Sequence, residues 1–209
     1  MIIAVDGPAA SGKGTLAKGI ARRYGLRHLD TGRTYRAVAL ALREGGFDYA
    51  DAKAAIRLAG EIDFDAIDED AINSAEIGDG ASKVAVLPDV RAVLVARQRA
   101  FATEAQAGAV LDGRDIGTVV CPDAHLKFYV VATPEERARR RALELYGSAE
   151  GEPYEALLAM LRERDARDTN RATSPLRPAA DAHILDTTKL TIEEAFAAAT
   201  ALVENARKL

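Results

Sequence analysis

The chain has 209 residues, which suits one α/β domain with inserted segments around a full hydrophobic core. A formal net charge of −4 argues against a broad nucleic-acid-binding surface, and the single cysteine, Cys121, excludes an internal disulfide and indicates a reducing compartment. No segment is long and apolar enough to span a bilayer, and the first residues read as a strand rather than a signal peptide, so we expect a cytoplasmic protein.

A phosphate-binding loop follows the first apolar strand, Ile2–Asp6, and opens a helix over Gly12–Tyr24. Its sequence, GPAASGKGT, contains the pattern G-x-x-x-x-G-K, in which backbone amides and a helix N-terminus converge on phosphate and Lys13 reaches the β- and γ-phosphates. The residue after Lys13 is a glycine, so the hydroxyl expected near Mg²⁺ is displaced by one position, a version typical of small nucleotide kinases. We therefore predict that ATP or GTP binds to Gly7, Pro8, Ala9, Ala10, Ser11, Gly12, Lys13, Gly14 and Thr15.

Short apolar runs alternate with helical patterns along the rest of the chain. The expected strands are Ile2–Asp6, His28–Leu29, Ala109–Leu111, Leu126–Val131 and His183–Leu185. The expected helices are Gly12–Tyr24, Arg33–Glu44, Asp89–Glu104, Pro134–Leu145, Glu152–Asp168 and Ile192–Lys208. This alternation predicts a three-layer P-loop fold of the α/β class, with a parallel five-stranded sheet and ligands at the carboxyl ends of the strands.

Three helix boundaries are marked by local sequence. Thr133 and Thr191 are expected N-caps, and each is followed three residues later by a glutamate, Glu136 or Glu194, that can complete a capping box. Pro134 suits the first helical position, and Gly25 is expected to end the first helix.

Two regions depart from the α/β rhythm. Residues 48–88 are polar and acidic and are expected to form a small helical flap, whereas residues 161–178 end a charged helix and are expected to act as a lid. The alternative is that both are ordinary surface excursions. We expect a single domain whose core comprises residues 1–47, 89–160 and 179–209.

Charged residues follow two of the predicted strands. Thr31 stands at the end of the short second strand, and Arg36 lies one turn into the next helix, where it can point to the ligand edge of the sheet. Asp112, Arg114 and Asp115 follow the apolar strand Ala109–Leu111, and Asp112 is suited to hold Mg²⁺ through water. The alternatives are a solvated helix charge for Arg36 and a plain surface turn for the other three.

Further arginines lie on two later helices. Arg164, Arg167, Asp168 and Arg171 share one helix face and could form the edge of a lid over a triphosphate, or else a solvated face with ion pairs. Arg137 could stack on the adenine of ATP, although a solvated basic face explains it equally well. His28, His125 and His183 are interpreted as structural or surface residues, because none has metal-ligand spacing, and Cys121 is interpreted as a small buried residue that fills the core.

Taken together, these motifs resemble the bacterial cytidylate kinase family over nearly the whole chain. Adenylate kinases have a similar phosphate loop but a different sequence after the third strand. The segments that carry the resemblance are GPAASGKGT (7–15), LDTGRTYR (29–36), ASKVA and VR within 81–91, DGRDIGTVV (112–120) and RERDARDTNRATSPL (162–176).

The resemblance implies transfer of a phosphoryl group from ATP to CMP or dCMP with Mg²⁺, which Thr15 and Asp112 would hold. It implies that Thr31, Arg36, Arg114 and Arg171 hold the CMP phosphate and the transferring group. Ser82, Arg91 and Asp115 would read cytosine, while Arg164 and Asp168 would contact the ribose. The catalytic set implied is Lys13, Arg36, Arg114, Arg164 and Arg171.

One departure and two alternatives remain. Many members of the family carry a longer flap with a β-hairpin, and the short acidic segment from Ile62 to Ala81 indicates that the hairpin is missing here. The alternatives are another nucleoside monophosphate kinase, for UMP or AMP, and a P-loop switch, although no N-K-x-D guanine-reading motif is present. We expect a monomer with small nucleotides as its partners and no nucleic acid or membrane.

Overall fold

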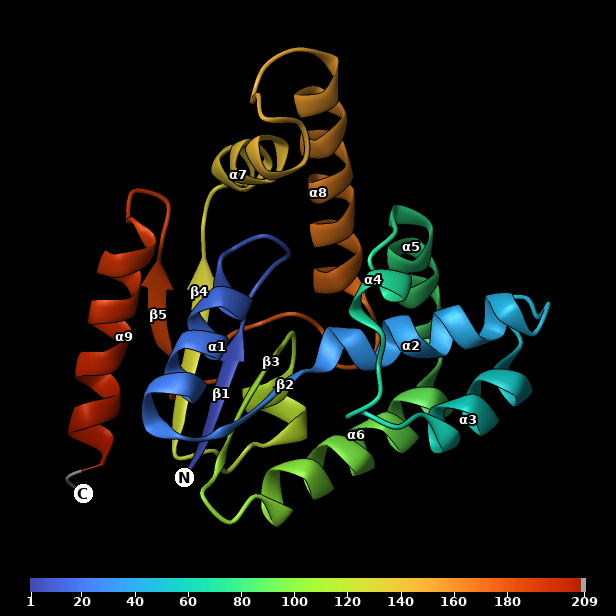
Figure 1. Cartoon of the computed structure of the whole chain (residues 1–209), viewed down its shortest axis with the longest axis horizontal. Coiled ribbons are helices and arrows are strands. Elements are labelled where there is room, and N and C mark those ends of the chain that lie inside the picture. The colour runs from blue at the N-terminus through green and yellow to red at the C-terminus, as the bar shows by residue number, and fades with distance from the viewer. Residues whose placement is uncertain (208–209) are drawn as a thin grey trace. The chain divides into compact units, whose positions relative to one another are not determined.

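The computed structural model describes residues 1–207, which divide into two compact units (Figure 1). The first unit joins Met1–His28 to the part of the chain from Ala105 on, and the second unit is Leu29–Glu104. Over residues 1–207, none of the helices has both the length and the apolar character that a membrane crossing requires.

A five-stranded sheet has the strand order β2-β3-β1-β4-β5, and all of its strands belong to the first unit except the last two residues of β2. β1 pairs in parallel with β3 and with β4, and β4 pairs in parallel with β5. The predicted fold class is therefore confirmed, with β2, β3 and β5 each extending further toward their carboxyl ends than expected. The strands are β1 (Ile2–Asp6), β2 (Arg27–Asp30), β3 (Ala109–Gly113), β4 (Leu126–Val131) and β5 (His183–Asp186).

The core of the first unit forms where α1 and α9 pack on the sheet. Ile3, Ile20, Phe128 and Val203 are fully or almost fully buried in one apolar cluster that α1, β1, β4 and α9 share. The helices α7 and α8 pack against each other beyond the end of β4 (Figure 1). The helices of this unit are α1 (Lys13–Tyr24), α7 (Pro134–Tyr146), α8 (Glu152–Asn170) and α9 (Ile192–Ala206), and a π-helical segment spans Ile116–Val120.

The predicted helix caps are confirmed with one correction, although α2 begins at Thr31 instead of Arg33 and α8 ends at Asn170 instead of Asp168. Gly25 ends α1 in the left-handed region, at φ 65°, and Thr191 and Glu194 form a complete capping box at the start of α9. Thr133 caps α7 as expected, but the carboxylate of Glu136 is hydrogen-bonded to Arg139 and Arg140 instead of completing a capping box. Lys208, the predicted last residue of α9, lies outside the described residues.

The second unit is helical and has its own core. Val38, Leu42, Ile77 and Leu94 are fully buried in a cluster to which α2, α5 and α6 contribute. The segment 48–88 is helical, as its composition predicted, and the compact unit that contains it also includes α2 and α6. The helices are α2 (Thr31–Glu44), α3 (Ala52–Glu61), α4 (Glu69–Ile72), α5 (Ala75–Val84) and α6 (Pro88–Glu104).

Candidate active site

The backbone of the phosphate loop between β1 and α1 is held in an unusual shape. Gly7 has a φ of 154°, and a Cβ at this position would lie 2.1 Å from the carbonyl oxygen of Val130. Ala10 adopts a left-handed φ of 59°, and Gly12 follows at 86°. No side chain caps the first amides of α1, in contrast to α2 and α9, which have side-chain N-caps. An anion fits this loop because backbone amides and the helix dipole both favour negative charge there.

Two side chains of the loop fit the same interpretation. Ser11 is fully buried, and its Oγ has no hydrogen-bond partner in residues 1–207. Lys13 is partly exposed at the start of α1, and its Nζ lies 3.4 Å from the carbonyl oxygen of Pro8. A buried hydroxyl without a partner is costly, so a ligand oxygen at the loop would satisfy it.

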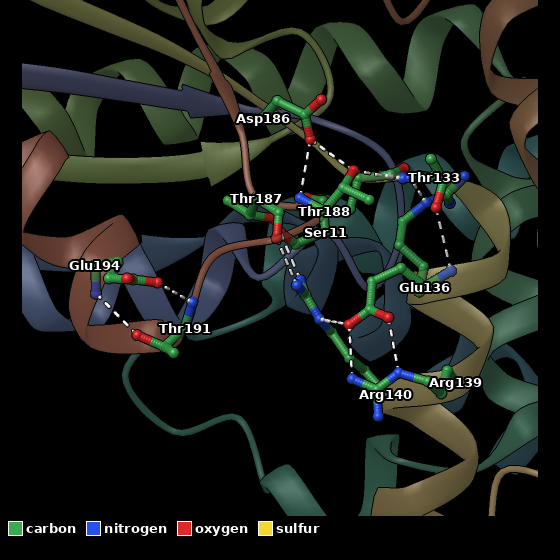
Figure 2. A network of polar contacts seen from close by, with 12 residues as sticks. Ser11, Thr133, Glu136, Arg139, Arg140, Asp186, Thr187, Thr188, Thr191 and Glu194 are labelled. Atoms are coloured by element: carbon green, nitrogen blue, oxygen red, sulfur yellow. Dashed lines mark hydrogen bonds and ion pairs between the residues drawn. The ribbon is translucent and has the colours of Figure 1, made fainter.

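A polar network behind the loop fixes its backbone (Figure 2). Thr187 donates its hydroxyl hydrogen bond to the carbonyl oxygen of Ser11 over 3.1 Å and lies in the turn after β5. Arg140 of α7 donates to the Thr187 hydroxyl at 3.2 Å and to the carboxylate of Glu136 at 2.8 Å. The turn after β5 and the start of α7 therefore hold the phosphate loop from behind.

Arg137 also supports the loop, which differs from the role we expected. Its guanidinium is 2% exposed and donates to the carbonyl oxygens of Ala9, at 3.1 Å, and Ala132, at 2.9 Å. The same group forms an ion pair with Asp165 of α8. A guanidinium buried by these partners has no open face for an adenine ring, so the stacking role is corrected to a structural one.

Asp112 lies in β3 next to the first turn of α1. It is 2% exposed, and a Cβ on Gly14 would lie 3.7 Å from its Oδ2. His28 holds the other carboxylate oxygen, with Nε2 2.8 Å from Oδ1. Thr15 is exposed in the same helical turn as Gly14. Residues 1–207 contain no cluster of three or more His, Cys, Asp or Glu side chains, and Mg²⁺ bound to phosphates needs only one or two protein oxygens.

A cluster of guanidinium and carboxylate groups, the lid cluster, joins the turn after β3 to the end of α8. Arg114 Nε donates to Asp168 Oδ2 over 2.8 Å. Burial alone would raise the pKa of Asp168, but the charges of Arg114, Arg164 and Arg171 hold it below its ordinary value. Arg171 also forms a 3.8 Å ion pair with Asp115. The structure thus brings together, within the first unit, Arg114, Asp115, Arg164, Asp168 and Arg171.

The other predicted site residues belong to the second unit. Arg36 donates from Nη1 to the carbonyl oxygen of Ile72 over 3.0 Å, and a Cβ on Gly78 would lie 3.1 Å from its Nη2. Arg91 is 3% exposed, donates to the carbonyl oxygen of Ala85 and lies 5.6 Å from the ring centre of Tyr35. Thr31 is buried in the first turn of α2, and Ser82 is half-buried on α5.

Sequence reasoning missed two contacts within the first unit, those of His28 and Asp6. His28, interpreted as structural or surface, contacts the carboxylate of Asp112, and the signal for this contact was its place in a strand next to that of Asp112 in the sheet. Asp6 is 3% exposed and accepts hydrogen bonds from the amides of Ile116 and Gly117. A carboxylate that ends an apolar strand directly before the phosphate loop was the signal for Asp6.

Three comparisons agree with this geometry. The family model described as cytidylate kinase matches residues 3–205. Proteins named cytidylate kinase from Rhizobium meliloti and Methylocella silvestris are 53% and 55% identical, over 99% of this chain and 97% and 95% of theirs. A shikimate kinase structure from Bacteroides thetaiotaomicron, 13% identical with a TM-score of 0.51 over 98% of both chains, shares the fold. The chain therefore belongs to the cytidylate kinase family.

Proposed function

We propose that the chain transfers the γ-phosphoryl group of ATP to CMP or dCMP and forms ADP with CDP or dCDP. The observation that carries the proposal is the lid cluster, in which three arginines and two aspartates lie together in the same unit as an uncapped phosphate loop. The family match supports a nucleotide kinase over a P-loop regulatory switch.

ATP would bind to the loop residues Gly7–Thr15, with Lys13 at the β- and γ-phosphates. The buried Ser11 hydroxyl and the uncapped start of α1 support this assignment. Asp112 and Thr15 offer the hard oxygen ligands that Mg²⁺ prefers, and Asp112 would act through water. The ion, when bound, neutralises charge on the transferring phosphates.

The reaction is a direct in-line transfer. An oxygen of the CMP phosphate forms a bond to the γ-phosphorus while the bond to the β–γ bridging oxygen breaks, and ADP leaves with that oxygen. The attacking oxygen of the CMP phosphate is already anionic at pH 7, so no general base is needed. The cationic side chains would stabilise the oxygens that gain charge; we assign this role to the ammonium of Lys13 and to the guanidinium groups of Arg36, Arg114, Arg164 and Arg171.

CMP would be held through its phosphate, ribose and base. Thr31, Arg36, Arg114 and Arg171 are assigned to the phosphate, and Arg164 and Asp168 to the ribose. Arg114 donates from Nε to Asp168, but a guanidinium has five N–H donors, so its remaining N–H groups can reach an anion. The cytosine readers are Ser82, Arg91 and Asp115.

The reader set accounts for selectivity against uracil. The carboxylate of Asp115 can accept from the N4 amino group of cytosine, and Arg91 and Ser82 can donate to N3 and O2. Uracil presents an oxygen to the carboxylate and an N–H to a donor. A buried polar group without a partner costs about 1–3 kcal/mol, which is enough for a preference.

The wider assignments also remain proposals. We infer a monomeric, cytoplasmic enzyme of pyrimidine nucleotide metabolism, with no nucleic-acid or membrane partner. The flap within residues 48–88 and the lid at 161–178 would close over the substrates and exclude water.

The test is a panel of nucleoside and deoxynucleoside monophosphates assayed with ATP and Mg²⁺, with ADP formation as the readout. We expect ADP to form with CMP and dCMP, more slowly with UMP and hardly at all without a monophosphate. Hydrolysis that does not depend on a monophosphate would support a switch and contradict the proposal. Equal or faster reaction with UMP or AMP would reassign the acceptor.

A further inference from the structure

The carboxylate of Asp6 binds two consecutive backbone amides on a neighbouring segment. Oδ1 accepts from the amide of Ile116 at 2.7 Å, and Oδ2 accepts from the amide of Gly117 at 2.8 Å. Asp6 is the last residue of β1, is 3% exposed and directly precedes the phosphate loop. A buried ionisable group with both oxygens on amides fixes the segment that carries those amides.

That segment lies close against Asp6 and Lys127. A Cβ on Gly117 would lie 3.3 Å from Asp6 Oδ2 and 3.1 Å from Cδ of Lys127. The ammonium of Lys127 in turn forms an ion pair with Asp181 at 2.9 Å. Gly117 is thus packed between two side chains, and a methyl group here would have to push one of them aside by a few tenths of an ångström.

The fixed segment carries two proposed substrate contacts on its N-terminal side. Arg114 and Asp115 immediately precede Ile116, and the carbonyl oxygen of Asp115 accepts from the amide of Val119 in the π-helical segment. A π-helical turn is rare and is frequently found at functional sites. Any shift of this turn would therefore displace both the guanidinium of Arg114 and the carboxylate of Asp115.

We propose that Asp6 is a positioning residue for CMP: by holding the amides of Ile116 and Gly117, it fixes the turn from which Arg114 meets the phosphate and Asp115 reads the cytosine. The inference rests on the proposed function of those two residues. This proposal gives Gly117, the second glycine of the D-G-R-D-I-G sequence, a physical role, because its lack of a side chain leaves room for the carboxylate of Asp6.

The positioning role explains why a carboxylate, and not an apolar side chain, occupies position 6. Burial raises the pKa of Asp6 to about 6, while the hydrogen bonds from Gly117 and Ile116 lower it. An aliphatic residue would fill the same space at no desolvation cost, so a core-filling role does not explain a carboxylate here.

The experiment compares Asp6→Asn with the wild type for CMP, UMP and ATP. The amide keeps the shape but offers one acceptor and sets an NH₂ group against the other amide. We expect KM for CMP to rise about tenfold or more, and the preference for CMP over UMP in kcat/KM to fall by a similar factor, from the loss of a buried hydrogen bond. KM for ATP should change less than about threefold, because the phosphate loop keeps its own bonds.

Two further variants complete the test. Gly117→Ala inserts a methyl group beside the carboxylate of Asp6 and should reproduce the CMP-selective loss, which decides the matter if Asp6→Asn fails to fold. Asp181→Asn is the matched control, because it removes a carboxylate from Lys127 beside the same glycine but does not touch the two amides. It should leave the CMP-to-UMP preference unchanged.

The outcomes separate the inference from the proposed function. A wild-type chain that prefers CMP, together with folded variants that keep its KM for CMP and its preference, would overturn the role of Asp6 alone. An equal rise in KM for ATP and CMP would overturn it too, because Asp6 would then act through the phosphate loop. A wild-type chain without preference for CMP would instead contradict the proposed function.

Discussion

The phosphate loop and the lid cluster lie in the same compact unit, yet they are built from different groups. The loop between β1 and α1 is shaped by its backbone, with Gly7 against Val130 and with buttresses from Arg137 and Thr187. The lid cluster consists of side-chain charges that neutralise one another, as Arg114 and Asp168 do. One region holds a fixed shape for an anion, and the other holds charges that a substrate can rearrange.

This difference suggests a division of labour between the two substrates. A rigid backbone cradle suits the phosphate chain of ATP, which is the same in every turnover, because the cradle needs little reorganisation on binding. In the lid cluster, aspartates provide ion-pair partners for the guanidinium groups before the CMP phosphate binds. Such an arrangement suits a site that must also select a base. Changes in the loop should therefore affect ATP, and changes in the cluster should affect CMP.

The largest effect is expected from Lys13→Ala in the phosphate loop. Loss of the Lys13 ammonium, which we assign to the transferring phosphates, should lower kcat about 10²–10³-fold, because removal of a preorganised transition-state contact has an effect of this size. Steady-state kinetics with ATP and CMP measure it. Lys18→Ala, an exposed lysine of the same helix, is the matched control and should keep normal activity.

Arg137→Met tests the buttress behind the loop. Removal of a buried guanidinium leaves Asp165 without its partner, and such losses typically cost about 3–5 kcal/mol of unfolding free energy. Asp165 is partly exposed, so we expect the lower end, with a rise in KM for ATP. Denaturant unfolding gives the energy, and Arg139→Ala, which removes an exposed pair, should cost at most about 1 kcal/mol. Similar losses in both variants would contradict the buttress role.

Asp115→Ala tests the opposite side of the comparison. The loss of the base-reading carboxylate should weaken CMP binding by about 1–3 kcal/mol, or roughly 5- to 150-fold, with ATP binding far less affected. Separate dissociation constants for CMP and for ATP check this. Equal weakening of both nucleotides would contradict the assignment of Asp115 to cytosine.

Asp6 directly precedes the phosphate loop and binds the segment that follows Arg114 and Asp115 of the lid cluster. Its raised pKa leads us to expect that stability depends on pH. Its pKa is raised from 3.8 to about 6, so the folded protein retains a proton that the unfolded chain loses between these values. The unfolding free energy of the wild type, relative to Asp6→Asn, should therefore fall as pH rises from 4 to 7, by on the order of 2 kcal/mol. Denaturant titrations at both pH values measure it, and a flat difference would be inconsistent with the raised pKa.

The smallest effect is expected from Arg162→Ala, within the same arginine-rich stretch as the lid cluster. Its ion pair with Glu135 is exposed, with side chains 59% and 52% accessible. Solvent screens such an exposed pair, so we expect almost no change in stability and unchanged kinetics for both nucleotides. A clear loss of CMP affinity would mean that the cluster extends to this residue.

The fold and the shape of the phosphate loop could be predicted because their signals are local. The alternation of strands and helices predicted the sheet, and G-x-x-x-x-G-K predicted the loop whose φ values at Gly7 and Gly12 require glycine. The capping box of Thr191 and Glu194 was likewise visible within four residues.

The contacts that sequence reasoning missed join residues far apart in the chain. Arg137 meets Ala9, His28 meets Asp112, and Asp6 meets Gly117 across at least 84 positions each. Helical spacing could place Arg137 on a charged helix, but only the packing of α7 behind the phosphate loop buries it. Glu136 was misassigned for a related reason, since two neighbouring arginines compete for its carboxylate.

The most direct test of the account is a crystal structure of the chain with CMP and a non-hydrolysable ATP analogue. We predict that the guanidinium groups of Arg36, Arg114 and Arg171 donate to the CMP phosphate at ordinary hydrogen-bond distances of about 2.7–3.2 Å, with the analogue's γ-phosphate at Lys13. A CMP phosphate bound away from Arg114 and Arg171, or an analogue bound outside the loop Gly7–Thr15, would contradict it.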